Sequence, residues 1–108
     1  MKLPSTTIIA TEKIKDYLLS QRKRNDKSEW LAKAGYKMEN WQQLEQDLRT
    51  QILSLDAIPT DETKYGQIFE IKGVLNGPNR KTLKVHTIWM REHESKYTKF
   101  ITMFPQKK

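Results

Sequence analysis

Apolar side chains recur at helical spacing through the first half of the chain. Ile14 and Leu18 stand four residues apart on one face, which predicts a first helix over about residues 12–21. A second, shorter helix is expected over about residues 27–34. Gly35 suits the left-handed backbone position that closes such a helix.

A third helix has the most regular pattern. Its apolar residues, spaced 3, 4, 4 and 3 positions apart, are Trp41, Leu44, Leu48, Ile52 and Leu55. Asn40 is a candidate N-cap, and Gln43 stands three residues later as in a capping box. Asp47 and Arg49 are expected to face away from the core. Pro59 cannot continue a helix, so this helix ends before it.

The second half of the chain is rich in residues that favour strands. Strands are predicted over about residues 65–75, 82–90 and 97–104. Asn76–Gly77–Pro78–Asn79 is a strong turn signal, and residues 92–95 give a softer one. Three strands joined by two tight turns form an antiparallel meander.

Alternation along the middle strand assigns its two faces. Leu83, Val85 and Trp89 share one face and are the better core candidates. Lys84 and His86 lie on the opposite face, which is expected to stay partly open to water.

These elements predict an α+β fold. Two to three N-terminal helices would pack on one face of a three- to four-stranded antiparallel sheet. A length of 108 residues suits one domain, with a helical half over about residues 11–56 and a β-meander over about residues 64–104.

The composition indicates a cytoplasmic protein. The chain has no cysteine, whereas small secreted domains usually carry disulfides. It shows neither a signal peptide nor the roughly 20 apolar residues that span a bilayer, so no membrane association is expected. His86 and His93 lack further ligands at a familiar spacing, and no glycine-rich phosphate loop occurs. Neither a metal nor a cofactor is therefore predicted.

The net charge of +7 makes the surface attractive to polyanions. Phosphate binding needs clustered cations, because each neutralised phosphate releases counterions. The predicted nucleic-acid contacts are the basic run and two lysines of the open sheet face: Arg22, Lys23, Arg24, Lys27, Lys72 and Lys84. The alternative for the basic run is an exposed loop whose charges only keep the protein soluble.

The open sheet face also predicts a candidate catalytic site. A hairpin centred on the predicted turn would place Glu70 across from His86, and Lys72 across from Lys84. A carboxylate beside an imidazole can tune it for proton transfer, and nearby cations can stabilise an anionic transition state. This alternative is a metal-independent ribonuclease that uses His86 with help from Lys84 and Arg91. A register error of one residue would dissolve the arrangement.

Aromatic residues allow two interpretations, stacking on bases or filling the core. The candidates are Trp30, Trp41, Trp89, Phe69, Phe100 and Phe104. We assign Trp41 and Trp89 to the core. Gly73, inside a predicted strand, marks a bulge or a close backbone approach.

Motifs in a fixed order run through nearly the whole chain. They are the helix at residues 13–19, Lys27, Trp30, Gly35–Tyr36, Trp41, Leu44, Tyr65–Gly66, Gly77–Pro78–Asn79–Arg80, Ile88–Trp89 and the ending Ile101–Thr102–Met103–Phe104–Pro105. Together they resemble an uncharacterised bacterial family, domain of unknown function 6883. Arg24–Asn25–Asp26 departs from the His-Pro-Gly-like segment that members of that family often carry. The resemblance implies no activity, although its helix-then-sheet layout is similar to that of small bacterial ribonuclease toxins.

Two hypotheses of function stand. The preferred one is a non-catalytic interaction module, toxin–antitoxin-like in context, that binds nucleic acid or an acidic protein partner. The other is the metal-independent ribonuclease. An open outer strand would also allow a homodimer to form through a sheet edge.

Overall fold

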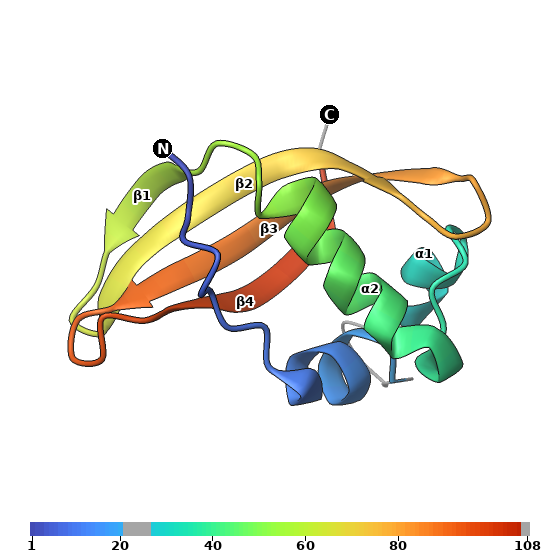
Figure 1. Cartoon of the computed structure of the whole chain (residues 1–108), viewed down its shortest axis with the longest axis horizontal. Helices are drawn as coiled ribbons and strands as arrows, with labels where there is room; N and C mark the ends of the chain where they lie inside the picture. The colour runs from blue at the N-terminus through green and yellow to red at the C-terminus, as the bar shows by residue number, and fades with distance from the viewer. Residues whose placement is uncertain (21–26, 107–108) are drawn as a thin grey trace.

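The computed structural model describes residues 1–20 and 27–106, which form one four-stranded antiparallel sheet and several short helical segments. The strands lie in the order β1–β2–β3–β4 (Figure 1): β1 (Ile58–Glu62), β2 (Gly66–Asn76), β3 (Thr82–Glu92) and β4 (Thr98–Pro105). The helical segments are η1 (Lys13–Leu18), α1 (Ser28–Ala32), η2 (Met38–Asn40), α2 (Trp41–Asp47) and η3 (Leu48–Ile52). The α+β class is therefore confirmed.

The helical half is more broken than the sequence predicts. Within the described residues α2 alone reaches seven residues, and η3 continues directly from it. The helices lie on the same side of the sheet in Figure 1, while the N-terminal segment crosses the end of the sheet that they leave uncovered. A helical layer on one face is thus confirmed only in part. No helix in the described part of the chain has the length and apolar character needed to cross a membrane.

The apolar residues predicted to form the buried face of the third helix are confirmed in the middle of the helix and wrong at its end. Leu44, Leu48 and Ile52 are fully buried, whereas Leu55 is 37% exposed. The helix ends before Leu55, so the spacing no longer carries this side chain inward. Trp41, assigned to the core from the sequence, packs against the core but is only partly buried.

Two polar predictions for this helix are wrong. Asp47 was expected to face outward, but it is only 7% exposed because Tyr36 Oη and Gln43 Nε2 donate to its carboxylate at 2.7 and 2.8 Å. The predicted capping box does not form. Asn40 Oδ1 instead accepts from the backbone N–H of Lys37, and Gln43 is occupied by Asp47.

A fourth strand, β1, lies in a segment where the sequence predicts only the end of the helix. β1 pairs with β2 through Ile58–Glu70 and Pro59–Phe69 before the register shifts. Pro59 is tolerated because β1 is an edge strand, where a missing N–H can face solvent.

Gly73 lies where side chains from the end of the helical half pack closely on the sheet. A Cβ at this position would come within 2.6 Å of Leu55 Cδ1 and 3.2 Å of Ile52 Cδ1. The close-approach interpretation of this glycine is therefore confirmed. Further along the sheet, the fully buried Trp89 meets Phe100 edge-on at 5.2 Å between ring centroids, as the core assignment of Trp89 predicts.

The β2–β3 hairpin contains the predicted turn, but it is longer than expected. Asn76 and Thr82 form its last pair, and Arg80 adopts a positive φ of 72°. The last strand has an irregularity of its own, since Ile88 pairs with Thr102 while Trp89 pairs with Phe100. Ile101 is therefore an extra residue in β4, and it changes which side chains of that strand face outward.

Candidate nucleic-acid interface

The face of the sheet away from the core carries a mixture of cations, aromatic rings and apolar side chains. From β2 and β3 it presents Glu70, Lys72, Lys84, His86 and Ile88. The buried residues that alternate with them are Phe69, Ile71, Leu75, Leu83, Val85, Thr87 and Trp89. Phe104 of β4 joins it because Phe104 pairs with His86. Lys72 and Lys84 are exposed on this face, whereas Glu70, His86, Ile88 and Phe104 are partly buried.

Register places these residues differently from the sequence prediction. Lys72, not Glu70, lies directly across from His86, and Val74, not Lys72, lies across from Lys84. The longer hairpin shifts the pairing by two residues. A shift of two keeps each side chain on its own face, so the predicted group of residues survives.

His86 is the centre of this group. Its Nε2 contacts Glu70 Oε1 diagonally across the strands, and its ring packs against Phe104 with centroids 4.6 Å apart and planes inclined at 52°. The two side chains of the Glu70–His86 pair are 29% and 17% exposed. The imidazole is therefore held in place on two sides while one part of it stays in reach of solvent.

A shallow cavity of about 360 Å³ opens beside the ring of His86. Lys72, Phe104 and Gln106 complete its lining. Gln106 Nε2 donates to the carbonyl oxygens of Gly73 and Val85, both at 3.1 Å, which fixes the end of β4 across the sheet. Lys72 and Lys84 are exposed, and neither side chain has a hydrogen bond or ion pair among the residues that the structure describes.

Arg91, predicted to assist His86, lies elsewhere. It is five residues further along β3, a separation of about 16 Å at roughly 3.3 Å per residue. An odd offset also points it to the side of the sheet that carries Trp89. It lines a different hollow, together with Phe69, so Arg91 cannot act with His86 and Lys84.

The predicted basic run is only partly visible. Arg22, Lys23 and Arg24 lie outside the described residues. Lys27 donates from Nζ to Tyr17 Oη at 2.9 Å and to Thr102 Oγ1 at 3.2 Å. Hydrogen bonds from Lys27 and Thr102 lower the pKa of Tyr17. These contacts attach the start of the second helical segment to the outer edge of β4.

Phe104 and Gln106 are the members of this site whose roles the sequence did not reveal. The sequence leaves Phe104 with two interpretations, and it gives no signal for a role of Gln106. The extra residue Ile101 reverses the alternation before Phe104, and no residue type announces a bulge there.

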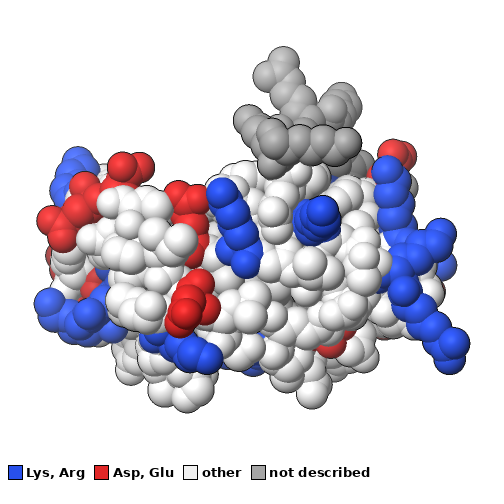
Figure 2. All heavy atoms as spheres, turned by 90° about the horizontal axis from the view of Figure 1, so that it is seen from above, with Lys and Arg blue, Asp and Glu red and all other residues white. Residues whose placement is uncertain are grey.

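The charge distribution of the molecule is uneven. Figure 2 shows acidic side chains gathered at the end that carries β1, where they mix with basic ones, while the opposite end is largely basic. Between the two ends, isolated basic side chains stand on a mostly uncharged surface. A polyanion approaching from this side would meet its strongest repulsion at the β1 end.

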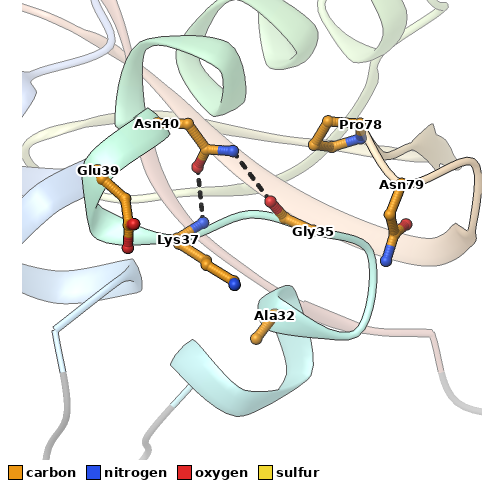
Figure 3. Close-up of a pocket in the computed structure, with 7 residues that line it drawn as sticks. All are labelled: Ala32, Gly35, Lys37, Glu39, Asn40, Pro78 and Asn79. Atoms are coloured by element: carbon orange, nitrogen blue, oxygen red, sulfur yellow. Dashed lines mark hydrogen bonds between the residues drawn. The ribbon is translucent and has the colours of Figure 1, made fainter.

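Another hollow, of about 480 Å³, lies between the loop after α1 and the β2–β3 turn (Figure 3). Its two asparagine side chains hold the loop in place. Asn40 Nδ2 donates to the carbonyl oxygen of Gly35, and Asn79 Nδ2 donates to that of Lys33, both at 3.0 Å. This hollow is a structural junction, and we assign it no binding role.

Comparison with known proteins gives a single match. The model of the family described as "Domain of unknown function (DUF6883)" matches residues 2–107. The chain belongs to the DUF6883 family. The resemblance drawn from the ordered motifs is confirmed. No curated protein and no solved structure matches this DUF6883 chain, so the match brings no activity with it.

Proposed function

We propose that this DUF6883 protein is a non-catalytic module that binds single-stranded RNA on the open face of its sheet. The observation that carries the proposal is the His86–Phe104 ring pair with Lys72 and Lys84 beside it. Aromatic side chains on an exposed sheet stack on unpaired bases, and adjacent lysines neutralise the backbone phosphates.

The surroundings of this ring pair support the same ligand. The net charge of +7 favours a polyanion in general, and the exposed lysines lie on the same face as the rings. Partly exposed Ile88 and Met90 extend the face along β3 and offer apolar contact to further bases. Double-stranded nucleic acid hides its bases inside a helix, so stacking of this kind favours a single strand.

The binding experiment is fluorescence anisotropy with a short labelled single-stranded RNA, in EDTA. Phe104→Ala should weaken binding by roughly 5- to 150-fold, the equivalent of losing one stacked base. Lys72→Gln and Lys84→Gln should each weaken binding and flatten its dependence on salt between about 50 and 200 mM. Lys37→Gln removes the same charge on the helical side of the molecule and serves as the matched control.

The proposal fails if Lys37→Gln weakens binding as much as Lys72→Gln does, because binding would then follow net charge alone. It also fails if the wild-type protein binds no RNA at low salt. In that case an acidic protein partner remains the other form of the interaction-module hypothesis.

A second candidate, a metal-independent ribonuclease, is favoured by one specific contact. Glu70 contacts His86 Nε2 and orients the imidazole, and Lys72 lies directly across from His86. His86 would take the proton of a ribose 2′-hydroxyl, whose oxygen would attack the adjacent phosphorus. The bond from phosphorus to the 5′-oxygen would break, and the departing oxygen would take up a proton from the imidazolium or from water, leaving a 2′,3′-cyclic phosphate and a 5′-hydroxyl. In this candidate Lys72 has the assisting role that the sequence hypothesis gives to Arg91.

The same RNA distinguishes the two candidates when it is analysed for cleavage after incubation in EDTA. The binding proposal expects intact RNA with the wild-type protein and with His86→Gln. Cleavage by the wild type that disappears in His86→Gln would establish the ribonuclease instead.

A further inference from the structure

A second polar hollow lies on the inner side of the sheet, at the end that the helices do not reach. The N-terminal segment crosses this end in Figure 1. Beneath it is a cavity of about 290 Å³, with Leu3, Pro4 and Phe69 providing apolar walls. Phe69 and Leu3 belong to the buried core, so this part of the cavity is a fixed surface.

Two cations stand at the cavity without a partner. Arg91 and Lys96 both line it, and neither side chain makes a hydrogen bond or an ion pair with any residue that the structure describes. Lys96 has a positive φ of 66°, a backbone conformation that glycine adopts far more readily than lysine. A lysine kept at such a position is a reason to look for a role of its side chain.

Thr98 adds a buried hydroxyl to the same cavity. Its side chain is only 3% exposed, and its Oγ1 has no hydrogen-bond partner in the described part of the chain. The same residues contain no side-chain oxygen or nitrogen that is both sealed from solvent and unpaired. The hydroxyl of Thr98 therefore keeps access to the cavity that it lines.

Acidic residues limit where an anion could sit. A neighbouring hollow of about 280 Å³ shares Phe69, Arg91 and Lys96, but it is also lined by Glu62 and Glu92. Hydrogen bonds from Lys99 and Ser95 lower the pKa of Glu92, which keeps this carboxylate charged. An anion is thus repelled from that hollow and directed to the side of Leu3 and Pro4.

We propose that the cavity under the N-terminal segment binds a small phosphate monoester with an apolar or aromatic body. Arg91 and Lys96 bind the phosphate, since guanidinium and ammonium groups form strong charge-assisted hydrogen bonds with its oxygens. The hydroxyl of Thr98 donates a further hydrogen bond. The body of the ligand packs on Phe69 and Pro4, in a volume near the lower limit for small-molecule sites.

The test is isothermal titration of the protein with phenyl phosphate, with inorganic phosphate as the comparison ligand. Phenyl phosphate should bind more tightly than inorganic phosphate, because only phenyl phosphate uses the apolar wall. Arg91→Gln should weaken binding about 10-fold or more, and Thr98→Val about 3-fold. Lys81→Gln, which removes a charge at the β2–β3 turn, should leave the affinity unchanged.

Lys96→Gly keeps the test decisive if Thr98→Val does not fold. This variant relieves the positive φ, so it should be at least as stable as the wild type and yet bind phenyl phosphate more weakly. Equal losses in Arg91→Gln and Lys81→Gln would overturn the proposal, as would affinities for the two ligands that do not differ. The outcome is independent of RNA binding, because the two sites lie on opposite faces of the sheet.

Discussion

Tyr36 and Asp47 form a buried polar pair whose contribution to stability should vary with pH in a defined way. Tyr36 is fully buried, and its hydroxyl donates to Asp47 Oδ2 at 2.7 Å. Burial, and then the hydrogen bond to Asp47, raise the pKa of Tyr36 far above its ordinary value of 10.0. The folded protein therefore holds the phenolic proton more tightly than the unfolded chain does.

The variant Tyr36→Phe removes the hydroxyl and leaves the ring in place. At neutral pH it should lower the free energy of unfolding by about 1.5–3 kcal/mol, the value of a hydrogen bond to a charged group. Asp47 would still accept a hydrogen bond from Gln43. The carbonyl oxygen of Asn76, which also lies within reach of the Tyr36 hydroxyl, would still accept one from Gln51. These remaining hydrogen bonds limit the loss of stability.

Above pH 10 the difference between the two proteins should shrink. Because the pKa of Tyr36 is raised by folding, its contribution is complete below the unfolded pKa of about 10 and is lost as pH rises beyond it. The loss is about 1.4 kcal/mol by pH 11 in the wild type. It is absent from Tyr36→Phe. The lowered pKa of Tyr17 acts in both proteins and cancels in the comparison.

Urea unfolding followed by tryptophan fluorescence, from pH 7 to about pH 11, measures both quantities. A difference between wild type and Tyr36→Phe that stays constant to pH 11 would refute the reasoning, because Tyr36 would then titrate alike in the folded and unfolded states. A neutral-pH cost below about 0.5 kcal/mol would show that the hydrogen bond to Asp47 contributes little.

Four further substitutions test the fold by thermal or urea unfolding. Arg80→Gly should raise the free energy of unfolding by about 1 kcal/mol, because glycine accepts the φ of 72° without strain; a decrease would contradict the strained turn. Gly77→Ala should lower it by more than about 2 kcal/mol, since its Cβ would lie 2.0 Å from the carbonyl oxygen of Ala34; an unchanged midpoint would contradict this contact. Trp89→Ala should cost about 3–5 kcal/mol and Trp41→Ala clearly less, because Trp89 alone of the two is fully buried; equal costs would contradict that difference.

The strand half of the fold could be predicted well because its signals are local. Alternation in β3 separates Lys84 and His86 from the buried Val85 and Trp89, and each of the four lies where its position in the sequence puts it. Pairing register depends on the turn. Arg80 takes a left-handed conformation that the sequence does not favour. The turn between Asn76 and Thr82 is longer than predicted, so every β2–β3 pair is displaced by two residues.

The helical half was harder because tertiary contacts override local preference. Asp47 has the position of a surface residue in the helical pattern. It is nevertheless buried, with its carboxylate accepting a hydrogen bond from the hydroxyl of Tyr36, eleven residues away. Asn40 has the spacing of an N-cap, but both polar atoms of its side chain form hydrogen bonds with the backbone of the preceding loop. β1 was missed because Pro59 is a strong signal for a helix end and carries no information about pairing with β2.

The close contact at Gly73 has a consequence for how the chain acquires its structure. Helices as short as α2 and η3 are unstable alone, so they depend on the sheet surface that they cover. That surface belongs to β2, which lies later in the chain. On the ribosome, the helical half would therefore emerge first and stay unstructured until Gly73 and its neighbours leave the exit tunnel.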